Sequence, residues 1–405
     1  MLIGLLAPLA AAEIVLRFLP VNAGLQTRTV NDRNPVMRFA ENRPFTYSVG
    51  WNFTLVNRGR TNNFGFVNDD DYDAGSRTPL LAVVGDSYVE ALMVPYSETL
   101  HGRLAACAKP RGRVYSFGVS GAPLSQYLVE ADFARSTFHP NAMVVVIVGN
   151  DFDESLLQYK SEPGMQYFQP GTNGLFLTRV DYVPSTARRV LRRSAVVRYL
   201  FHNLNVVGPW QRFRAAQYLG NTLATVDSAR VANSRAAVDQ FLRELPVRSA
   251  VEPARIVLLV DGIRPNLYTS EGLSAAEGSY VDLMRRYFVA KATEDGFEVL
   301  DLQPRFIERY RRDGVRFEFS TDQHWNGTGH EEAAAAVASS GVFSRLFGDL
   351  ECAQTSRRSR WLSRAAERVH LRPPRGLRAS VDAVEHAVTV AVGGAATRVD
   401  QRAQR

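Results

Sequence analysis

Five short apolar runs between residues 80 and 302 set the hydrophobic pattern of this chain. They read LLAVV (80–84), RVYSFGV (113–119), AMVVVIV (142–148), ARIVLLV (254–260) and FEVLDL (297–302). The runs are rich in Val, Leu and Ile and do not alternate apolar with polar positions, which is typical of parallel strands buried on both faces. Helical stretches separate them. The pattern therefore predicts an α/β fold built around a parallel sheet.

The first twenty residues, MLIGLLAPLAAAEIVLRFLP, are apolar as far as Ala12 and amphipathic afterwards. The apolar part is short for a bilayer span, and it lacks the basic start of a standard signal peptide. Three interpretations stay open: a signal-anchor whose start lies upstream, an uncleaved short anchor, and a buried N-terminal helix. We favour a membrane anchor or signal-like helix over residues 1–20 that directs the protein to the cell envelope.

The remaining chain divides by composition. Residues 21–77 are rich in Asn, Arg, Gly and Asp with aromatics between them, which predicts short strands and turns that pack on the core. The main domain is expected at 78–350, with a helical insertion at about 152–233 that is too long for an ordinary α/β connection. Part of this insertion, STARRVLRRSAVVRYLFHNL, has the pattern of a basic amphipathic helix. The Arg-rich tail, 351–405, is predicted to be disordered.

The formal net charge of +7 belongs to the tail. From Ala353 to the end there are eleven arginines and four acidic residues, a difference of +7, so the rest of the chain is neutral. A neutral body argues against a nucleic-acid partner. Cys107 and Cys352 show neither a disulfide framework nor metal-ligand spacing, and we expect two unpaired thiols. We expect no metal and no cofactor.

Polar residues follow three of the apolar runs. Ser87 stands in Gly85-Asp86-Ser87, Gly121 stands in GVSGAP, and Asn150 stands in Gly-Asn-Asp. Ligands of such sheets bind outside the C-terminal ends of the strands, so these residues are expected to meet in one cleft. Near the end of the domain comes STDQHWNGTGHEEAAAAVA, with Asp322 and His324 before a helix. Thr328 and Glu331 have the spacing of a capping box at its start.

These residue types together predict ester chemistry. A serine hydroxyl becomes an effective nucleophile when a neighbouring base takes its proton, and His324 can be that base for Ser87. Asp322 can orient the histidine ring, with Trp325 buried as the anchor of its loop. The backbone N–H groups of Ser87 and Gly121 and the side-chain amide of Asn150 can form an oxyanion hole. Gly85 permits the tight turn, and Asp86 is expected to order the loop by hydrogen bonds.

This set resembles the SGNH hydrolases, also called the GDSL family, whose four sequence blocks supply Ser, Gly, Asn and His. Ser87, Gly121, Asn150 and His324 match these blocks in the family's order, and the resemblance covers about residues 79–345. It implies a three-layer, flavodoxin-like fold. Two positions depart from the family pattern: the acid stands two residues before His324 rather than three, and Ser116 stands where the second block often begins with Asn. The DQHWN form resembles the cell-envelope branch that includes alginate O-acetylation proteins.

The resemblance implies a serine esterase or acyl-transfer enzyme that acts on ester-linked acyl groups, above all O-acetyl groups, of cell-envelope glycans. The expected partners are an acylated carbohydrate and a membrane, contacted through the N-terminal helix, with the enzyme facing the periplasm or the exterior. One alternative is a lipid or thioester hydrolase with the insertion as a lid, although the many arginines of the insertion favour polar or anionic substrates. The other alternative is a non-catalytic, glycan-binding assembly component.

Overall fold

The computed structural model describes residues 2–109, 111–172, 174–206, 218–219, 222–223, 226–320, 322–350 and 352. The predicted disordered tail lies outside this range, except for Cys352. By its internal contacts the chain divides after Leu350, and the fold described below is that of the unit before this point.

A five-stranded parallel sheet forms the centre of the fold. The strands are β3 (Leu80–Gly85), β4 (Arg113–Gly118), β5 (Ala142–Ile147), β10 (Ile256–Val260) and β11 (Glu298–Asp301). Their order in the sheet is β11-β10-β5-β3-β4, and every neighbouring pair is parallel. Counted along the chain this order is 2-1-3-4-5, which is the flavodoxin-like order. The predicted α/β fold is therefore confirmed. All residues of β3, β5 and β10 are buried, as continuous apolar runs require.

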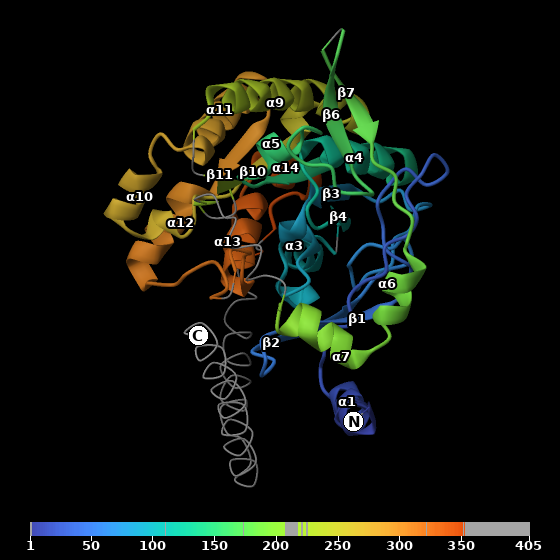
Figure 1. The fold of residues 1–405 in the computed structure, drawn as a ribbon. Helices are drawn as coiled ribbons and strands as arrows, with labels where there is room; N and C mark the ends of the chain where they lie inside the picture. Colours follow the sequence, from blue (N-terminus) through green and yellow to red (C-terminus); the bar gives the residue numbers. More distant parts are fainter. Residues whose placement is uncertain are drawn as a thin grey trace. The chain divides into compact units, whose positions relative to one another are not determined.

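Helices cover both faces of this sheet (Figure 1). One face carries α4 (Leu124–Phe138), α9 (Ser228–Ser249) and α11 (Tyr280–Glu294). The other carries α3 (Leu100–Ala108), α12 (Leu302–Asp313) and α13 (Gly327–Ala338), and α14 (Gly341–Phe347) follows α13. Shorter helical elements are α2 (Ser87–Glu90), η1 (Tyr96–Glu98), α5 (Asp151–Glu154), η3 (Pro253–Arg255), η4 (Asn266–Tyr268) and α10 (Ser270–Ala276). The result is a three-layer fold. The loops that follow the C-terminal ends of its strands carry candidate residues.

The predicted capping box at α13 is wrong. The N-cap is Asn326, whose side chain accepts hydrogen bonds from the backbone N–H groups of Thr328 and Gly329. The helix therefore begins two residues earlier than expected, at Gly327. Asparagine is as good an N-cap as threonine is, so the sequence offered two possible starts.

The N-terminal region forms a helix and a hairpin. Helix α1 (Leu2–Phe18) leaves the body of the unit (Figure 1), and its described side chains are largely exposed rather than buried in the core. None of the helices that the structure describes has the length and apolar character needed to cross a bilayer. The predicted short strands are present as an antiparallel hairpin of β1 (Pro44–Val49) and β2 (Leu55–Arg60).

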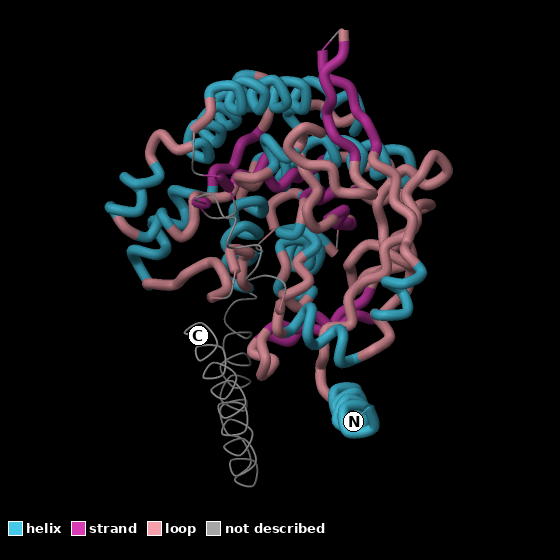
Figure 2. The backbone as a smooth tube through the Cα atoms, viewed as in Figure 1, coloured by secondary structure: helices cyan, strands magenta, loops and turns pink. Residues whose placement is uncertain are grey.

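The sequence predicted a helical insertion after β5, but the insertion contains strands as well as helices. It begins with an antiparallel hairpin of β6 (Gln166–Gly171) and β7 (Gly174–Arg179), which projects from the body (Figure 2). Then come α6 (Thr186–Leu191), α7 (Ala195–Arg198), a π-helical turn η2 (Tyr199–Asn203) and two short paired strands, β8 (Tyr218–Leu219) and β9 (Thr222–Leu223). Helix α9 starts at Ser228, inside the range expected for the insertion.

Neither cysteine is a free thiol. Cys107 and Cys352 are both disulfide-bonded, so the expectation of two unpaired thiols is wrong. Two cysteines with no motif around them gave no signal of a disulfide in the sequence.

Candidate active site

The structure brings Ser87, His324 and Asp322 together at the C-terminal edge of the sheet. Ser87 is the first residue of α2, directly after β3, and His324 lies in the loop that precedes α13. The Nε2 atom of His324 is 2.7 Å from the Oγ atom of Ser87. On the other side of the ring, Nδ1 is 3.1 Å from Oδ1 of Asp322. This is the geometry in which a histidine can take the proton of a serine hydroxyl while a carboxylate holds its ring.

The electrostatics of Asp322 fit the role of the acid. Burial alone would raise its pKa, but the hydrogen bond and the charge of His324 outweigh burial and hold the pKa below its usual value. Asp322 is therefore an anion at neutral pH and can stabilise an imidazolium. Tyr47 of β1 lies near enough to sense this charge: burial, and then the negative charge of Asp322, raise the pKa of Tyr47 to about 12.

A second carboxylate, that of Asp86, lies next to the serine and has a different role. Its Oδ1 accepts the backbone N–H of Tyr88 at 2.9 Å and caps α2, while its Oδ2 is 3.4 Å from Oγ of Ser87. Asp86 is only 2% exposed, and burial raises its pKa to about 6. Its hydrogen bonds order the turn that presents Ser87.

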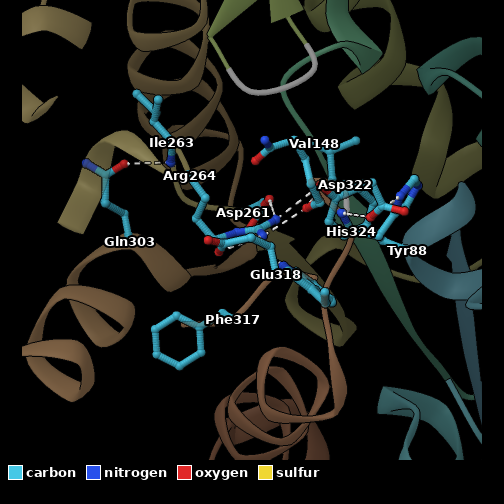
Figure 3. Close-up of polar contacts among 12 residues, drawn as sticks. Tyr88, Val148, Asp261, Ile263, Arg264, Gln303, Phe317, Glu318, Asp322 and His324 are labelled. Carbon is cyan, nitrogen blue, oxygen red and sulfur yellow. Dashed lines mark hydrogen bonds and ion pairs between the residues drawn. The ribbon is translucent and has the colours of Figure 1, made fainter. Parts of the chain in front are cut away.

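A buried ionic cluster around Arg264 holds the histidine loop in place (Figure 3). The guanidinium pairs with Asp261 at 2.6 Å and with Glu318 at 3.5 Å. It also donates to the carbonyl oxygen of Gln323 at 2.9 Å and to the hydroxyl of Tyr88 at 3.1 Å. Because Gln323 stands between Asp322 and His324, these contacts fix the backbone of the acid–histidine pair.

Trp325 anchors the same loop, as the sequence predicted. Its side chain is fully buried, and its Nε1–H donates to Oδ1 of Asp261 at 2.9 Å. The hydroxyl of Tyr88 donates to the carbonyl of Gln323 at 2.8 Å, so the residue after the nucleophile touches the residue before the base. Sequence reasoning missed Tyr88, Asp261 and Arg264, because their positions in the sequence carry no pattern that distinguishes them from other buried residues.

Gly121 lies in the loop after β4 and adopts a φ of +78°, which favours glycine. This loop is held from both sides. Glu90, at the end of α2, accepts hydrogen bonds from the backbone N–H of Ser120 at 2.6 Å and from its hydroxyl. Lys160 donates to the carbonyl oxygen of Gly121 at 2.9 Å. The backbone on either side of the glycine N–H is therefore fixed by side chains.

Asn150 is connected to Gly121 by the same lysine. It lies after β5 as the N-cap residue of α5, and its Nδ2 donates to Oε2 of Glu154 at 3.0 Å. The same oxygen pairs with Nζ of Lys160 at 2.6 Å. A chain of contacts thus runs from Asn150 through Glu154 and Lys160 to the carbonyl of Gly121. The two residues that connect the loops were not predicted, and both lie near the start of the insertion.

A partly open pocket of about 30 Å³ borders the chain neighbours of Ser87, Asn150 and His324, namely Tyr88, Gly149 and Gln323. The apolar part of its wall includes Val148 and Phe152. Ser87, Asn150 and His324 themselves are not among its lining residues, and the space is enough for about two waters.

Comparison with known proteins finds similar solved structures, but no matching family model and no matching curated protein. No family model matches the chain, and no curated protein matches it. Among solved structures, TesA aligns with 64% of this chain and 95% of its own at 16% identity and a TM-score of 0.32. A lipase/acylhydrolase from Enterococcus faecalis aligns with 68% and 99% at 13% identity and a TM-score of 0.36. The acetyl xylan esterase AlAXEase aligns with 64% and 97% at 11% identity and a TM-score of 0.34. Similarities this low leave the function to be argued from the site itself.

Proposed function

We propose that this protein is a serine ester hydrolase or acyl-transfer enzyme that uses Ser87 as its nucleophile. The observation that carries the proposal is the continuous contact from Ser87 Oγ to His324 Nε2 and from His324 Nδ1 to Asp322. The serine oxygen attacks the ester carbonyl carbon while His324 accepts its proton. His324 then gives that proton to the leaving alcohol, and an acyl-serine remains. Water, or a sugar hydroxyl in a transferase, completes the cycle.

The oxyanion of the tetrahedral intermediate requires donors at the same edge of the sheet. We assign them to the backbone N–H groups of Ser87 and Gly121 and to the amide of Asn150. The amide nitrogen of Asn150 carries two hydrogens, and the contact with Glu154 sets the direction in which it points. Removal of one such donor in other enzymes slows the reaction by about 10²–10³.

The DQHWN block, which resembles that of O-acetylation proteins, supports acetyl as the transferred group over the alternative of a lipid or long-chain thioester hydrolase. The complete set of Ser87, His324 and Asp322 speaks against the third possibility, a non-catalytic glycan-binding component.

We propose acylated cell-envelope glycans as the substrate and the cell envelope, outside the cytoplasm, as the location. The disulfide-bonded state of Cys107 and Cys352 supports this location, because disulfides persist in oxidising compartments such as the periplasm. The DQHWN block, which resembles that of O-acetylation proteins, supports the substrate class. Contact with the membrane through the N-terminal helix belongs to the same proposal.

A fluorophosphonate probe tests the nucleophile. We expect it to label Ser87 covalently, and we expect Ser87→Ala to abolish the labelling in folded protein. Labelling at another serine, or none in the wild type, would refute the proposal. Acetate release from a panel of acetylated glycans, with and without an acceptor sugar, then separates hydrolysis from transfer.

Chain-length selectivity tests the size of the acyl group. From p-nitrophenyl acetate to the octanoate we expect kcat/KM to fall at least about 100-fold. A wild-type enzyme that prefers the octanoate would favour the lipid hydrolase instead.

A further inference from the structure

Exposed apolar side chains gather on three segments of the chain. Most of the large apolar side chains that are exposed among the described residues lie on α1, on the turn of the β1–β2 hairpin and on residues 183–206. Within these segments the most exposed are Phe18 at 85%, Val183 at 74% and Trp51 at 62%. Others are Leu9, Ile14, Val15, Leu19, Val190, Leu191, Leu200, Phe201, Leu204 and Val206. So much exposed apolar surface marks an interaction site.

Hydrogen bonds join these segments into one surface. Glu13 of α1 accepts the backbone N–H groups of Ala195 and Val196 at the start of α7, each at 3.0 Å. Tyr199 donates to the carbonyl of Trp51 at 2.6 Å. Figure 1 shows α1, α7 and the hairpin at the same end of the unit. We call this surface, formed by α1, the hairpin turn and residues 183–206, the docking face.

The longest segment of the docking face carries positive charges only. Residues 182–206 contain five arginines and no acidic residue. Arg192 and Arg198 donate to the backbone carbonyls of Leu25 and Asn22 and so hold the segment against the body. Arg189 and Arg193 are exposed. Apolar side chains flanked by arginines are typical of a segment that lies in the interface of an anionic bilayer.

We propose that the docking face lies on an anionic phospholipid bilayer, with its apolar side chains among the acyl chains and its arginines at the headgroups. This goes beyond a membrane contact through the N-terminal helix alone, because the insertion supplies a second, charge-dependent contact. A protein partner fits less well, because α1 is apolar along most of its length and large apolar side chains of its second half are exposed.

The hairpin relates the docking face to the active site. Tyr47 of β1 packs against the buried cluster of Ala91, Met93 and Val94 that directly follows α2, and Trp51 in the adjoining turn lies on the docking face. The four residues of chain from Tyr47 to Trp51 span at most about 13 Å. The active site is thus held close to the bilayer surface, where an enzyme acting on envelope glycans would meet its substrate. This last point rests on the proposed function, whereas lipid binding does not.

Flotation of the full-length protein with vesicles tests the docking face. The vesicles contain either phosphatidylcholine alone or 30% phosphatidylglycerol in phosphatidylcholine. We expect tighter binding to the anionic vesicles and a loss of this difference at high salt. Arg189→Gln/Arg193→Gln should weaken binding to anionic vesicles about 5-fold for each arginine, from the usual contribution of a basic residue near such a surface. Arg77→Gln/Arg311→Gln removes two exposed arginines elsewhere and should leave binding unchanged.

Phe201→Ser tests the apolar part and should weaken binding to both kinds of vesicle. Three results would overturn the proposal: no binding to either vesicle, equal binding to both, or binding that the Arg189→Gln/Arg193→Gln variant does not change. Turnover of soluble p-nitrophenyl acetate should be the same in all these variants. A wild-type protein that turns over the ester normally but does not bind vesicles would refute the docking face alone, and absent turnover in a wild type that binds anionic vesicles would refute the proposed function alone.

Discussion

Replacement of either carboxylate near Ser87 by its amide separates the two roles that the structure gives them. Asp322 Oδ1 lies 3.1 Å from His324 Nδ1, whereas Asp86 Oδ2 lies 3.4 Å from Ser87 Oγ. A carboxylate that touches the serine is the natural rival for the catalytic acid. Asp322→Asn and Asp86→Asn change one oxygen to one nitrogen each and are matched in size.

The expected losses differ by orders of magnitude. The interaction with His324 keeps Asp322 ionised, so Asp322→Asn removes a charge from beside the imidazolium. The new amide can also donate to Nδ1, which stabilises the tautomer that has its proton on Nε2 and cannot accept the proton of Ser87. In a serine protease this change costs about 10⁴ in turnover. We expect a loss of about 10³–10⁴ here, or about 4–5.5 kcal/mol of transition-state stabilisation.

Asp86→Asn should cost less than about tenfold. The amide oxygen of the variant can still accept the N–H of Tyr88 and cap α2, which is the main contact of Asp86. The assay is turnover of p-nitrophenyl acetate at neutral pH, with circular dichroism as the check on folding and Ser87→Ala as the inactive reference. Near-normal turnover in Asp322→Asn together with an inactive Asp86→Asn would refute the assignment of the acid.

Three further predictions concern buried charges. Arg264→Met leaves the buried carboxylate of Asp261 without its cation and removes one of the two arginines that pair with Glu318, so it should lower the free energy of unfolding by about 3–5 kcal/mol in urea titrations. Burial raises the pKa of Glu130 from 4.5 to about 8, so its contribution to stability is full below pH 4.5 and is lost as pH rises through about 8. Glu130→Gln should remove this slope from unfolding curves taken at pH 5, 7 and 9. Lys160→Met and Glu154→Gln should each lower kcat at least about tenfold with little change in KM, and the double variant should lose little more than either alone, because both act through one chain of contacts.

The sheet could be predicted from the sequence because strands that are buried on both faces are continuous apolar runs. The apolar runs at 80–84, 142–148 and 254–260 became β3, β5 and β10, with their ends shifted by at most two residues. The strands of the insertion do not have this pattern. The strands of the β6–β7 hairpin are mostly partly buried or exposed, so the hairpin was not distinguished from loop.

Residues of the candidate site could be predicted only where the type of side chain itself indicates a catalytic role. Ser87, Asp322 and His324 stand at strand ends or before a helix, and they meet in the structure. Arg264 and Lys160 could not be found in this way. Their importance comes from what they touch, and a lysine or arginine in the sequence is most often a solvated surface residue.

The short spacing between acid and base has a physical explanation in this loop. Oδ1 of Asp322 accepts the backbone N–H of His324 at 2.9 Å as well as its ring Nδ1 at 3.1 Å. An aspartate that bonds the backbone two residues on closes a tight turn. The carbonyl of Gln323 inside that turn receives hydrogen bonds from Tyr88 and from Arg264. A three-residue spacing would place a different backbone group under those two donors. The two-residue spacing and the Arg264 cluster are therefore parts of one arrangement in this loop.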